Sequence, residues 1–354
     1  MSGSSLDGLD VAFAELEENG GQWNFEIKAA KCFEYDDVWK NKLQNAVHLN
    51  AHNYFLLNSD FGKFCAEKIN LFIEENALQY QVQLIGFHGH TTFHSPKENV
   101  TAQLGNAAII AAHTGINVVS DLRSIDVAFG GEGAPIVPIG EKLLFKNFDY
   151  FLNIGGIANV SFNIENNYFA FDVCAANRVL NLLAMQAGKA FDEDGKIAAT
   201  GNINEKLLKQ LNEESYYKQS FPKSLSNNFG TEIIYPVIKN YSLSTADALR
   251  TYCEHIAIQI RKAFENNQQN GEKKLLITGG GALNVFLTGR IKTLLQTLNI
   301  QTIIPQKEII NFKEALIMGL IATLRWREEN TVIKTVTGAK RNSIGGAIWI
   351  GQEA

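Results

Sequence analysis

The sequence predicts an α/β fold divided into two domains, and three observations carry this prediction. A chain of 354 residues is longer than one ordinary hydrophobic core and indicates two domains of roughly 150–200 residues each. Stretches with the alternation of β-strands are followed by stretches with helical periodicity, an order typical of α/β domains. A strand, a glycine-rich turn and a second strand open the chain and recur from Tyr150, so we expect the two domains to begin alike.

The N-terminal half is expected to form a hairpin followed by alternating helices and strands. Residues 9–16 alternate in polarity after a Gly/Ser turn and residues 23–30 follow the turn Asn19-Gly20-Gly21, so these two strands should pair. Apolar side chains at helical spacing predict a helix over residues 61–76. The remaining elements are a buried strand at 84–87 that ends at Gly89, an alanine-rich helix at 103–114 stopped by Gly115, and a strand at 116–120.

The C-terminal half is expected to open with a meander and to continue with helices. The predicted strands are 151–154, 158–164, 168–171 and 275–277; the predicted helices are 176–187, 245–266, a segment that follows Gly279-Gly280-Gly281 and ends at Leu298, and 314–328. Glycines and prolines interrupt regular structure near residues 135–148. We therefore assign 1–135 to an N-terminal domain and 136–335 to a C-terminal domain, and leave 336–354 without a domain.

The composition excludes several classes of function. Acidic and basic residues are mixed along the chain and give a formal net charge of −5, whereas a nucleic-acid-binding protein usually carries a basic face. The four cysteines are scattered without a Cys-x-x-Cys pair, which fits a reducing compartment. No apolar run approaches the roughly 20 residues that span a bilayer, and no secretory signal is recognisable. We expect a cytoplasmic protein without nucleic-acid or membrane partners.

Three glycine-rich turns, each attached to a strand, indicate a nucleotide site. Glycine lets backbone N–H groups approach phosphate oxygens, and serine hydroxyls add neutral donors. Each turn alone is also explained as a tight hairpin turn, but three in this order favour a nucleotide. No Gly-x-x-x-x-Gly-Lys-Ser/Thr loop occurs, which excludes a P-loop NTPase. The candidate nucleotide-binding residues are Ser2, Gly3, Ser4, Ser5, Asp7, Gly8, Gly155, Gly156, Gly279, Gly280 and Gly281.

Motifs along the whole chain resemble those of the anhydro-N-acetylmuramic acid kinase family. They are Met1-Ser-Gly-Ser-Ser-Leu-Asp-Gly-Leu-Asp10, Gly89-His90-Thr91, residues 121–126 and 130–135, Asn153-Ile-Gly-Gly-Ile-Ala-Asn-Val-Ser161, Phe171-Asp172, Asp194-Gly195, Pro222-Lys-Ser224, residues 278–284, Lys313-Glu-Ala315 and Thr337-Gly-Ala339.

The resemblance implies a fold, a reaction and an assembly. The fold would be that of the actin/Hsp70/hexokinase-like superfold, with two RNase H-like lobes around a cleft that holds ATP and Mg²⁺. The reaction would hydrolyse the 1,6-anhydro bridge of anhydro-N-acetylmuramic acid and phosphorylate O6, giving N-acetylmuramic acid 6-phosphate in cell-wall recycling. The assembly would be a homodimer. Two alternatives stay open: another sugar or acid kinase of this superfold, and an ATP-binding switch without phosphotransfer.

Asp172 is the expected general base. It follows the predicted strand 168–171 and precedes a predicted helix, a position that also suits an N-cap. The resemblance gives it the task of deprotonating the water that attacks the anomeric carbon, which frees the bridge oxygen to attack the γ-phosphoryl group. A carboxylate is already deprotonated near pH 7. The following residues Val173-Cys174-Ala175-Ala176-Asn177 depart from the family pattern Thr-Gly-Pro-Gly-Asn.

Arg123 and Glu314 are expected in the sugar pocket, as the resemblance implies. A guanidinium offers planar paired donors to a sugar carboxylate such as a lactyl group or to a phosphoryl group. Its alternative is a surface ion pair with Asp121 or Asp126. Glu314 starts an otherwise apolar predicted helix, and its alternative is a favourable acid in a first helical turn.

The segment with His88, His90 and His94 has three interpretations. The resemblance places His90 and Thr91 at the substrate, with His90 standing where the family has an amide side chain. Three histidines on an extended segment also match a zinc site, and a polar strand end needs no ligand at all.

Two further side chains are assigned to the nucleotide or the sugar. Asp7 lies beside the first phosphate loop and is the expected Mg²⁺-linked carboxylate, with a turn-forming Asx residue as the alternative. Lys223 reaches sugar or phosphate, or else is a solvated loop lysine.

The first glycine-rich turn lacks a preceding strand. A phosphate-loop hairpin of this superfold needs a strand on each side, yet only Met1 precedes Ser2. A missing strand would leave an unpaired sheet edge. We therefore expect roughly six to ten residues upstream that form an apolar strand.

Overall fold

The computed structural model describes residues 1–3, 6–164, 167–220, 223–226, 228–265, 267 and 271–351, and its chain forms two compact units. The first unit comprises Met1–Lys146 and Phe312–Ala354, and the second comprises Asn147–Asn311. This division differs from the expected domains in two ways. The first unit extends past residue 135 to Lys146, and it also includes the C-terminal residues from Phe312 onward. Among the described residues, none of the helices combines the length and the apolar character that crossing a membrane requires.

The second unit is built on a five-stranded sheet with the order β11-β10-β7-β8-β9. Strands β7 (Tyr150–Ile154), β8 (Ile157–Ile164) and β9 (Asn167–Ala175) form an antiparallel meander, whereas β10 (Lys273–Thr278) and β11 (Ile300–Ile303) run parallel to β7. This order and these directions are those of an RNase H-like sheet, so the α/β prediction is confirmed.

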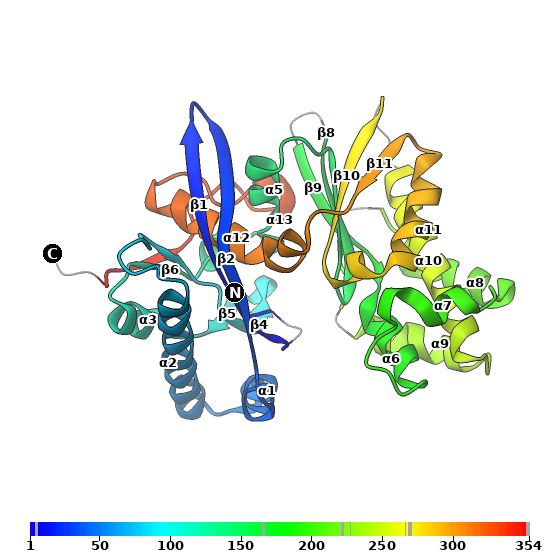
Figure 1. Ribbon diagram of the computed structural model, residues 1–354, viewed down its shortest axis with the longest axis horizontal. Coiled ribbons are helices and arrows are strands. Elements are labelled where there is room, and N and C mark those ends of the chain that lie inside the picture. Colours follow the sequence, from blue (N-terminus) through cyan, green and yellow to red (C-terminus); the bar gives the residue numbers. More distant parts are fainter. Residues whose placement is uncertain are drawn as a thin grey trace. The chain divides into compact units, whose positions relative to one another are not determined.

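The helices of the second unit pack on this sheet and complete its core (Figure 1). Tyr150 and Phe162 of the sheet are fully buried together with Tyr252 and Phe264 of α10. Central strands therefore have apolar contacts on both faces, as their near-continuous apolar sequences require. The helices are α6 (Asn177–Met185), α7 (Lys196–Thr200), α8 (Glu205–Asn212), α9 (Tyr235–Lys239), α10 (Thr245–Glu265) and α11 (Val285–Gln296).

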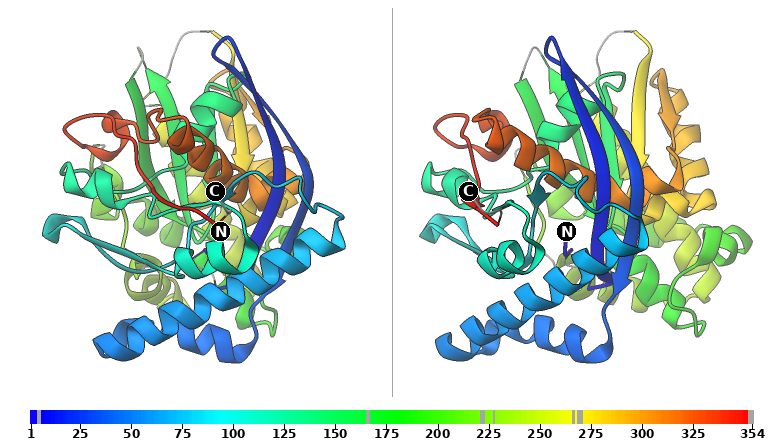
Figure 2. Two further views of the ribbon diagram at one scale, coloured as in Figure 1. Left: turned by 90° about the vertical axis from the view of Figure 1, so that its left-hand side faces the viewer. Right: turned by 60° about the vertical axis from the view of Figure 1, so that its left-hand side comes forward.

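The first unit contains a long hairpin and two smaller sheets (Figure 2). The hairpin pairs β1 (Gly8–Asn19) with β2 (Gln22–Glu34) and confirms the predicted one. A three-stranded sheet has the order β12 (Ala347–Trp349), β6 (Val118–Ser120), β3 (Ile85–Gly86), and a second hairpin pairs β4 (His90–Ser95) with β5 (Val100–Leu104). The helices are α1 (Asp37–Gln44), α2 (Ala51–Glu75), α3 (Ala107–Thr114), α4 (Ser124–Ala128), α5 (Pro138–Leu144), α12 (Lys307–Trp326, of which 312–326 belong to this unit) and α13 (Lys334–Thr337).

Specific contacts explain why the end of the chain belongs to the first unit. Lys313 of α12 forms a buried ion pair with Glu141 of α5 at 2.8 Å. A Cβ at Gly140 would lie 2.4 Å from the side chain of Ile317, so α5 and α12 touch where only glycine fits. Strand β12 then pairs antiparallel with β6. None of these contacts is local in sequence, which is why hydrophobic periodicity gave no sign of them.

The β4–β5 hairpin corrects one prediction. Residues 103–106 were assigned to a helix, but the helix starts at Ala107. Asn106 caps it by accepting hydrogen bonds from the N–H groups of Ala108 and Ile109. Gly105 before it has φ +119°, a conformation that favours glycine.

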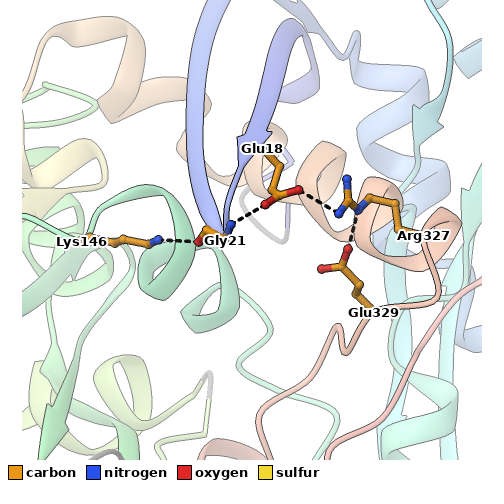
Figure 3. A network of polar contacts seen from close by, with 5 residues as sticks. All are labelled: Glu18, Gly21, Lys146, Arg327 and Glu329. Carbon is orange, nitrogen blue, oxygen red and sulfur yellow. Dashed lines mark hydrogen bonds and ion pairs between the residues drawn. The ribbon is translucent and has the colours of Figure 1, made fainter.

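A polar network holds the tip of the β1–β2 hairpin (Figure 3). Glu18 accepts hydrogen bonds from the N–H of Gly21 at 2.5 Å and from Nη2 of Arg327 at 3.0 Å. Arg327 also contacts Glu329, and Lys146 donates to the carbonyl of Gly21 at 2.9 Å. Exposed pairs of this kind contribute about 0–1 kcal/mol each, so their effect is to orient the hairpin more than to stabilise the unit.

Candidate active site

Two of the three glycine-rich turns lie side by side in the second unit. Gly155 and Gly156 follow β7, and Gly279 follows β10; the two strands are parallel neighbours, with Asn153 opposite Thr278. Both turns therefore leave the same edge of the sheet, the carboxyl edge where α/β proteins bind ligands. Both turns were predicted to bind the nucleotide, and the structure places them side by side.

Only glycine fits at two positions of the turn that follows β10. A Cβ at Gly279, whose φ is +80°, would lie 2.5 Å from Oδ1 of Asn153. A Cβ at Gly281 would lie 2.3 Å from the side chain of Ile154. The turn thus packs its backbone directly against the end of β7, which brings the N–H groups of both turns into one region.

Asn177 ties the two turns together and was not among the predicted site residues. Its Nδ2 donates to the carbonyl of Ile154 at 3.0 Å, and its backbone N–H donates to the carbonyl of Gly155 at 3.0 Å. Its side chain also approaches Gly280 and Gly281. The only sequence signal was that residues 173–177, which otherwise differ from the family pattern, keep its asparagine.

Asp172 lies within β9 rather than at its end. The strand continues to Ala175 and α6 begins at Asn177 with Ala176 at its N-cap, so the predicted strand end at residue 171 and the N-cap alternative are both wrong. Val173, Cys174, Ala175 and Ala176 are buried, and Tyr252 donates to the carbonyl of Ala175 at 2.8 Å. Val173, Cys174 and Ala175, which differ from the family pattern, therefore extend strand β9.

The carboxylate of Asp172 is half-buried and is held on one side. Its Oδ2 accepts a hydrogen bond from the N–H of Leu225 at 2.8 Å, and its backbone carbonyl accepts one from the hydroxyl of Tyr216 at 2.7 Å. Burial raises the pKa of Asp172 above its ordinary value, and the bond from Leu225 opposes that rise. A fixed carboxylate with a raised pKa suits proton abstraction.

Lys223 lies beside the backbone of Asp172 and is half-buried, with its ammonium over aromatic rings. Its ammonium is 4.6 Å from the ring centroid of Tyr216 and 5.8 Å from that of Phe171. Its backbone carbonyl accepts a hydrogen bond from the N–H of Asp172 at 3.3 Å. Partial burial lowers the pKa of Lys223.

Arg123 is the centre of a polar cluster in the first unit. Its Nε donates to Nε2 of His88 at 2.9 Å and its Nη1 donates to the carbonyl of Gly133 at 2.6 Å. Burial lowers its pKa to about 10, so it remains a cation at neutral pH. The alternative of a surface ion pair required a pair with Asp121 or Asp126, and in the part of the chain that the structure describes Arg123 is half-buried and forms neither.

His88 orients Arg123 as a neutral acceptor. Burial, and next the charge of Arg123, lower the pKa of His88 well below its ordinary value. The neutral ring can accept at Nε2, which is the atom that receives the bond from Arg123. Within the described residues its buried Nδ1 has no hydrogen-bond partner.

Asp126 shapes the loop that Arg123 contacts, a role the sequence did not reveal. This fully buried carboxylate accepts a hydrogen bond from the N–H of Gly133 and one from the hydroxyl of Thr337, each at 2.8 Å. A Cβ at Gly131 would lie 2.3 Å from it. The segment 130–133 therefore wraps around Asp126 and presents the Gly133 carbonyl to Arg123.

Glu314 lies in the middle of α12, which begins at Lys307, so the first-turn alternative is wrong. Burial raises the pKa of Glu314, the positive charges of Lys313 and Arg123 lower it, and the negative charge of Asp10 raises it. The charges of Glu314 and Arg123 act on one another, so these two side chains lie within electrostatic reach in the first unit.

His90 and Thr91 begin β4, opposite Leu104 and Gln103 of β5. His90 is buried and its pKa is lowered by that burial, so its ring is neutral near pH 7. Gly89 before it permits a close approach, because a Cβ there would lie 1.8 Å from the carbonyl oxygen of Leu104. His94 instead bonds Thr101 at 3.1 Å, and across the described ranges no three acidic, cysteine or histidine side chains form a metal-binding group.

The first glycine-rich turn is described only in part, because Ser4 and Ser5 lie outside the described residues. Ser2 is buried, and its hydroxyl oxygen accepts a hydrogen bond from Tyr35 at 2.8 Å. Gly8 is required, since a Cβ there would lie 2.6 Å from both Sγ of Cys32 and the carbonyl of Phe33. Gly3 is half-buried and the side chain of Asp7 is exposed.

Comparisons with known proteins agree with these motifs. The anhydro-N-acetylmuramic acid kinase family matches residues 1–351. The chain is 31% identical to an anhydro-N-acetylmuramic acid kinase of Sulfurimonas denitrificans, covering 99% of this chain and 98% of that protein. It is 32% identical to one of Vibrio parahaemolyticus, covering 99% and 96%. Among solved structures, a ROK family glucokinase from Streptomyces griseus in complex with glucose and AMPPNP is similar at 10% identity and a TM-score of 0.40, covering 88% of this chain and 99% of that one. The predicted resemblance is confirmed, and the chain belongs to the anhydro-N-acetylmuramic acid kinase family.

Proposed function

We propose that this chain uses ATP to convert anhydro-N-acetylmuramic acid into N-acetylmuramic acid 6-phosphate, as a step of cell-wall recycling in the cytoplasm. Family membership gives the class of activity, an ATP-dependent sugar kinase. The observation that carries the proposal to this chain's own residues is Asp172, a half-buried carboxylate fixed by the N–H of Leu225 at 2.8 Å.

Asp172 acts as the general base. It takes a proton from water, the water oxygen attacks the anomeric carbon, and the bond from that carbon to the bridge oxygen breaks. The bridge oxygen stays on C6 and attacks the γ-phosphoryl group, and ADP leaves. Because Oδ2 already accepts the Leu225 N–H, Oδ1 is the oxygen that faces the water.

The glycine turns bind the phosphates of ATP. The paired turns after β7 and β10 offer backbone N–H groups at one sheet edge, and their glycines leave room for phosphate oxygens. In the first unit, the turn with Ser2, Gly3 and Gly8 is the candidate for phosphate binding. Mg²⁺ takes carboxylate oxygens, and the exposed carboxylate of Asp7 fits that preference; when bound, the ion neutralises phosphate charge.

Arg123, Glu314, His90 and Thr91 hold the sugar. Arg123 is oriented by His88 and Gly133, so it can offer Nη2 to the lactyl carboxylate at little entropic cost. Neutral His90 donates or accepts a hydrogen bond to a hydroxyl. Glu314 accepts from another hydroxyl.

The test is ADP release with and without anhydro-N-acetylmuramic acid. The proposal requires release that depends on this sugar, with a homodimer in solution by light scattering as a separate expectation. Release that depends equally on other sugars favours another kinase specificity, and slow release without sugar favours an ATP-binding switch.

A further inference from the structure

A fully buried histidine of the second unit, His255 of α10, takes no part in the chemistry described above. Its Nδ1 lies 2.8 Å from Oδ1 of Asn212, the last residue of α8, and its Nε2 lies 3.1 Å from the hydroxyl of Tyr217. Burial, and next the charge of Lys262, lower the pKa of His255 to about 3, so the ring is neutral near pH 7. A polar ring inside an apolar core costs stability unless both nitrogens have partners, so its two bonds identify what it holds.

The hydrogen bonds around this histidine have fixed directions. Gln259, one turn further along α10, donates from Nε2 to the same Oδ1 of Asn212 at 2.7 Å. An amide oxygen only accepts, so Nδ1 of His255 carries the ring proton and Nε2 is an acceptor. The hydroxyl of Tyr217 therefore donates to Nε2. The histidine thus joins Tyr217 to both α8 and α10.

Tyr217 lies in a stretch of chain that holds Asp172, residues 215–220 and 223–225, here called the clamp segment. Near one end of the clamp segment, the hydroxyl of Tyr216 donates to the carbonyl of Asp172 at 2.7 Å. At the other end, the N–H of Leu225 donates to Oδ2 of the same aspartate at 2.8 Å. Both the backbone and the carboxylate of the base are therefore bonded to the clamp segment.

Tyr217 is one of the anchors of the clamp segment. Residues 215 and 218–220 are exposed, whereas Tyr217 packs against the core of the second unit. Its ring centroid lies 6.3 Å from that of Phe229 and 5.0 Å from that of His255. Ring packing alone leaves room for sliding, and the hydrogen bond to Nε2 adds a constraint on direction.

We propose that His255 is a positioning residue for the base: by holding Tyr217 it keeps the clamp segment where Leu225 fixes one oxygen of Asp172. The inference rests on the proposed function, since it takes Asp172 as the general base. A displaced Leu225 N–H bonds Oδ2 less well, and the carboxylate is then free to rotate away from the orientation that proton abstraction needs.

The acidity of Asp172 distinguishes positioning from simple stabilisation. The bond from Leu225 lowers the pKa of Asp172, so weakening it should raise that pKa and move the acidic limb of kcat/KM to higher pH. Three other titratable groups lie around this carboxylate. Burial raises the pKa of Tyr216 and Cys174, and it lowers that of Lys223 from an ordinary value of 10.5, so the acidic limb belongs to Asp172.

The test compares Tyr217→Phe with the parent protein and with a matched control, Tyr241→Phe. Each variant loses one tyrosine hydroxyl; that of Tyr241 donates to Gln210 of α8 at 2.6 Å and lies outside the clamp segment. Tyr217→Phe should lower kcat about five- to tenfold, leave both KM values within about twofold, and raise the acidic limb by about half a pH unit. Amide exchange at Leu225 should become about tenfold faster. Tyr241→Phe should change none of these quantities.

A second substitution tests whether His255 and Tyr217 act as one unit. His255→Asn keeps an N–H donor for Asn212 but is too short to reach Tyr217. This variant, and the double variant with Tyr217→Phe, should show the same kcat as Tyr217→Phe alone, whereas independent effects would multiply.

The proposal is overturned if Tyr217→Phe leaves both the acidic limb and the exchange at Leu225 unchanged, even when Tm falls, because a purely structural hydroxyl would give that result. Multiplied effects in the double variant overturn it as well. A parent protein without sugar-dependent ADP release contradicts the proposed function instead. The exchange at Leu225 then still decides whether His255 holds the clamp segment.

Discussion

The N–H of Leu225 donates a hydrogen bond to Oδ2 of Asp172 at 2.8 Å, which fixes one oxygen of a half-buried carboxylate inside β9. Sequence placed this aspartate at a strand–helix junction, where capping a helix would explain it. Inside a strand that explanation is gone, and the side chain costs stability through its burial. A costly carboxylate held in one orientation is expected at a catalytic position.

Asp172→Asn should reduce turnover by at least about 10²-fold, the scale of losing a general base. Asparagine keeps an oxygen for the Leu225 N–H, so the fold and ATP binding should persist, as circular dichroism and nucleotide titration would check. Asp60→Asn, on an exposed turn of α2, is the control and should be active. Turnover of the Asp172 variant within a few-fold of the parent protein would remove Asp172 from the mechanism.

The same variant should be more stable than the parent protein at pH 7. The pKa of Asp172 is higher folded than unfolded, so the protonated form favours folding and this advantage is lost as pH rises from about 3.8 through the folded pKa. At pH 7 the charge costs stability, which asparagine relieves. Tm measured at pH 7 should rise while Tm near pH 3 should change little; a lower Tm at pH 7 contradicts this.

Activity should fall as pH falls through the raised pKa of Asp172. The base must be ionised, so the acidic limb of kcat/KM should lie above the range of an ordinary aspartate. His90 should not contribute a second limb near neutrality, since its own pKa is lowered. A pH–rate profile that stays flat down to about pH 4 would argue against an aspartate base in this environment.

Arg123→Lys should raise KM for the sugar by about tenfold or more, because one ammonium cannot bond His88, Gly133 and a carboxylate in the planar geometry of a guanidinium. KM for ATP should change less. Arg327→Lys at the hairpin tip is the matched control and should leave both constants alone. Sugar kinetics unchanged by Arg123→Lys would assign this arginine to folding only.

Gly156→Ala should raise KM for ATP by about tenfold, as expected where a backbone must approach phosphate closely. A Cβ at this position comes no nearer than 3.5 Å to the side chain of Arg178, so the fold should tolerate it. Gly289→Ala provides the comparison at an exposed helical site. An unchanged KM for ATP, with Tm also unchanged, would show that phosphate does not contact this turn.

The parts of the fold that sequence predicted are those with local causes. The β1–β2 hairpin follows from Gly20-Gly21, and the β7–β8–β9 meander follows from Gly155-Gly156 and alternating apolar residues. The β4–β5 hairpin was missed because its strands are polar and its turn contains Asn99 with φ +57° instead of a glycine pair. The return of residues 312–354 to the first unit depends on contacts across the whole chain, such as Lys313 with Glu141.

The residues of the candidate site also fall into two groups, those that sequence could predict and those that it could not. Glycines and catalytic side chains are recognisable as residue types, so Asp172, Arg123 and the three turns were found. Asn177 and Asp126 act on the backbone of residues distant in sequence, and nothing in their own surroundings marks that role. Such residues become visible only once the fold brings their partners to them.

The most direct test of the account is to compare initial rates on anhydro-N-acetylmuramic acid and on N-acetylmuramic acid, which has a free O6 and no bridge. The account predicts ADP release with the anhydro sugar, formation of N-acetylmuramic acid 6-phosphate by mass spectrometry, and loss of both in Asp172→Asn. It is contradicted by equal turnover of the sugar without a bridge, or by ADP release that needs no sugar.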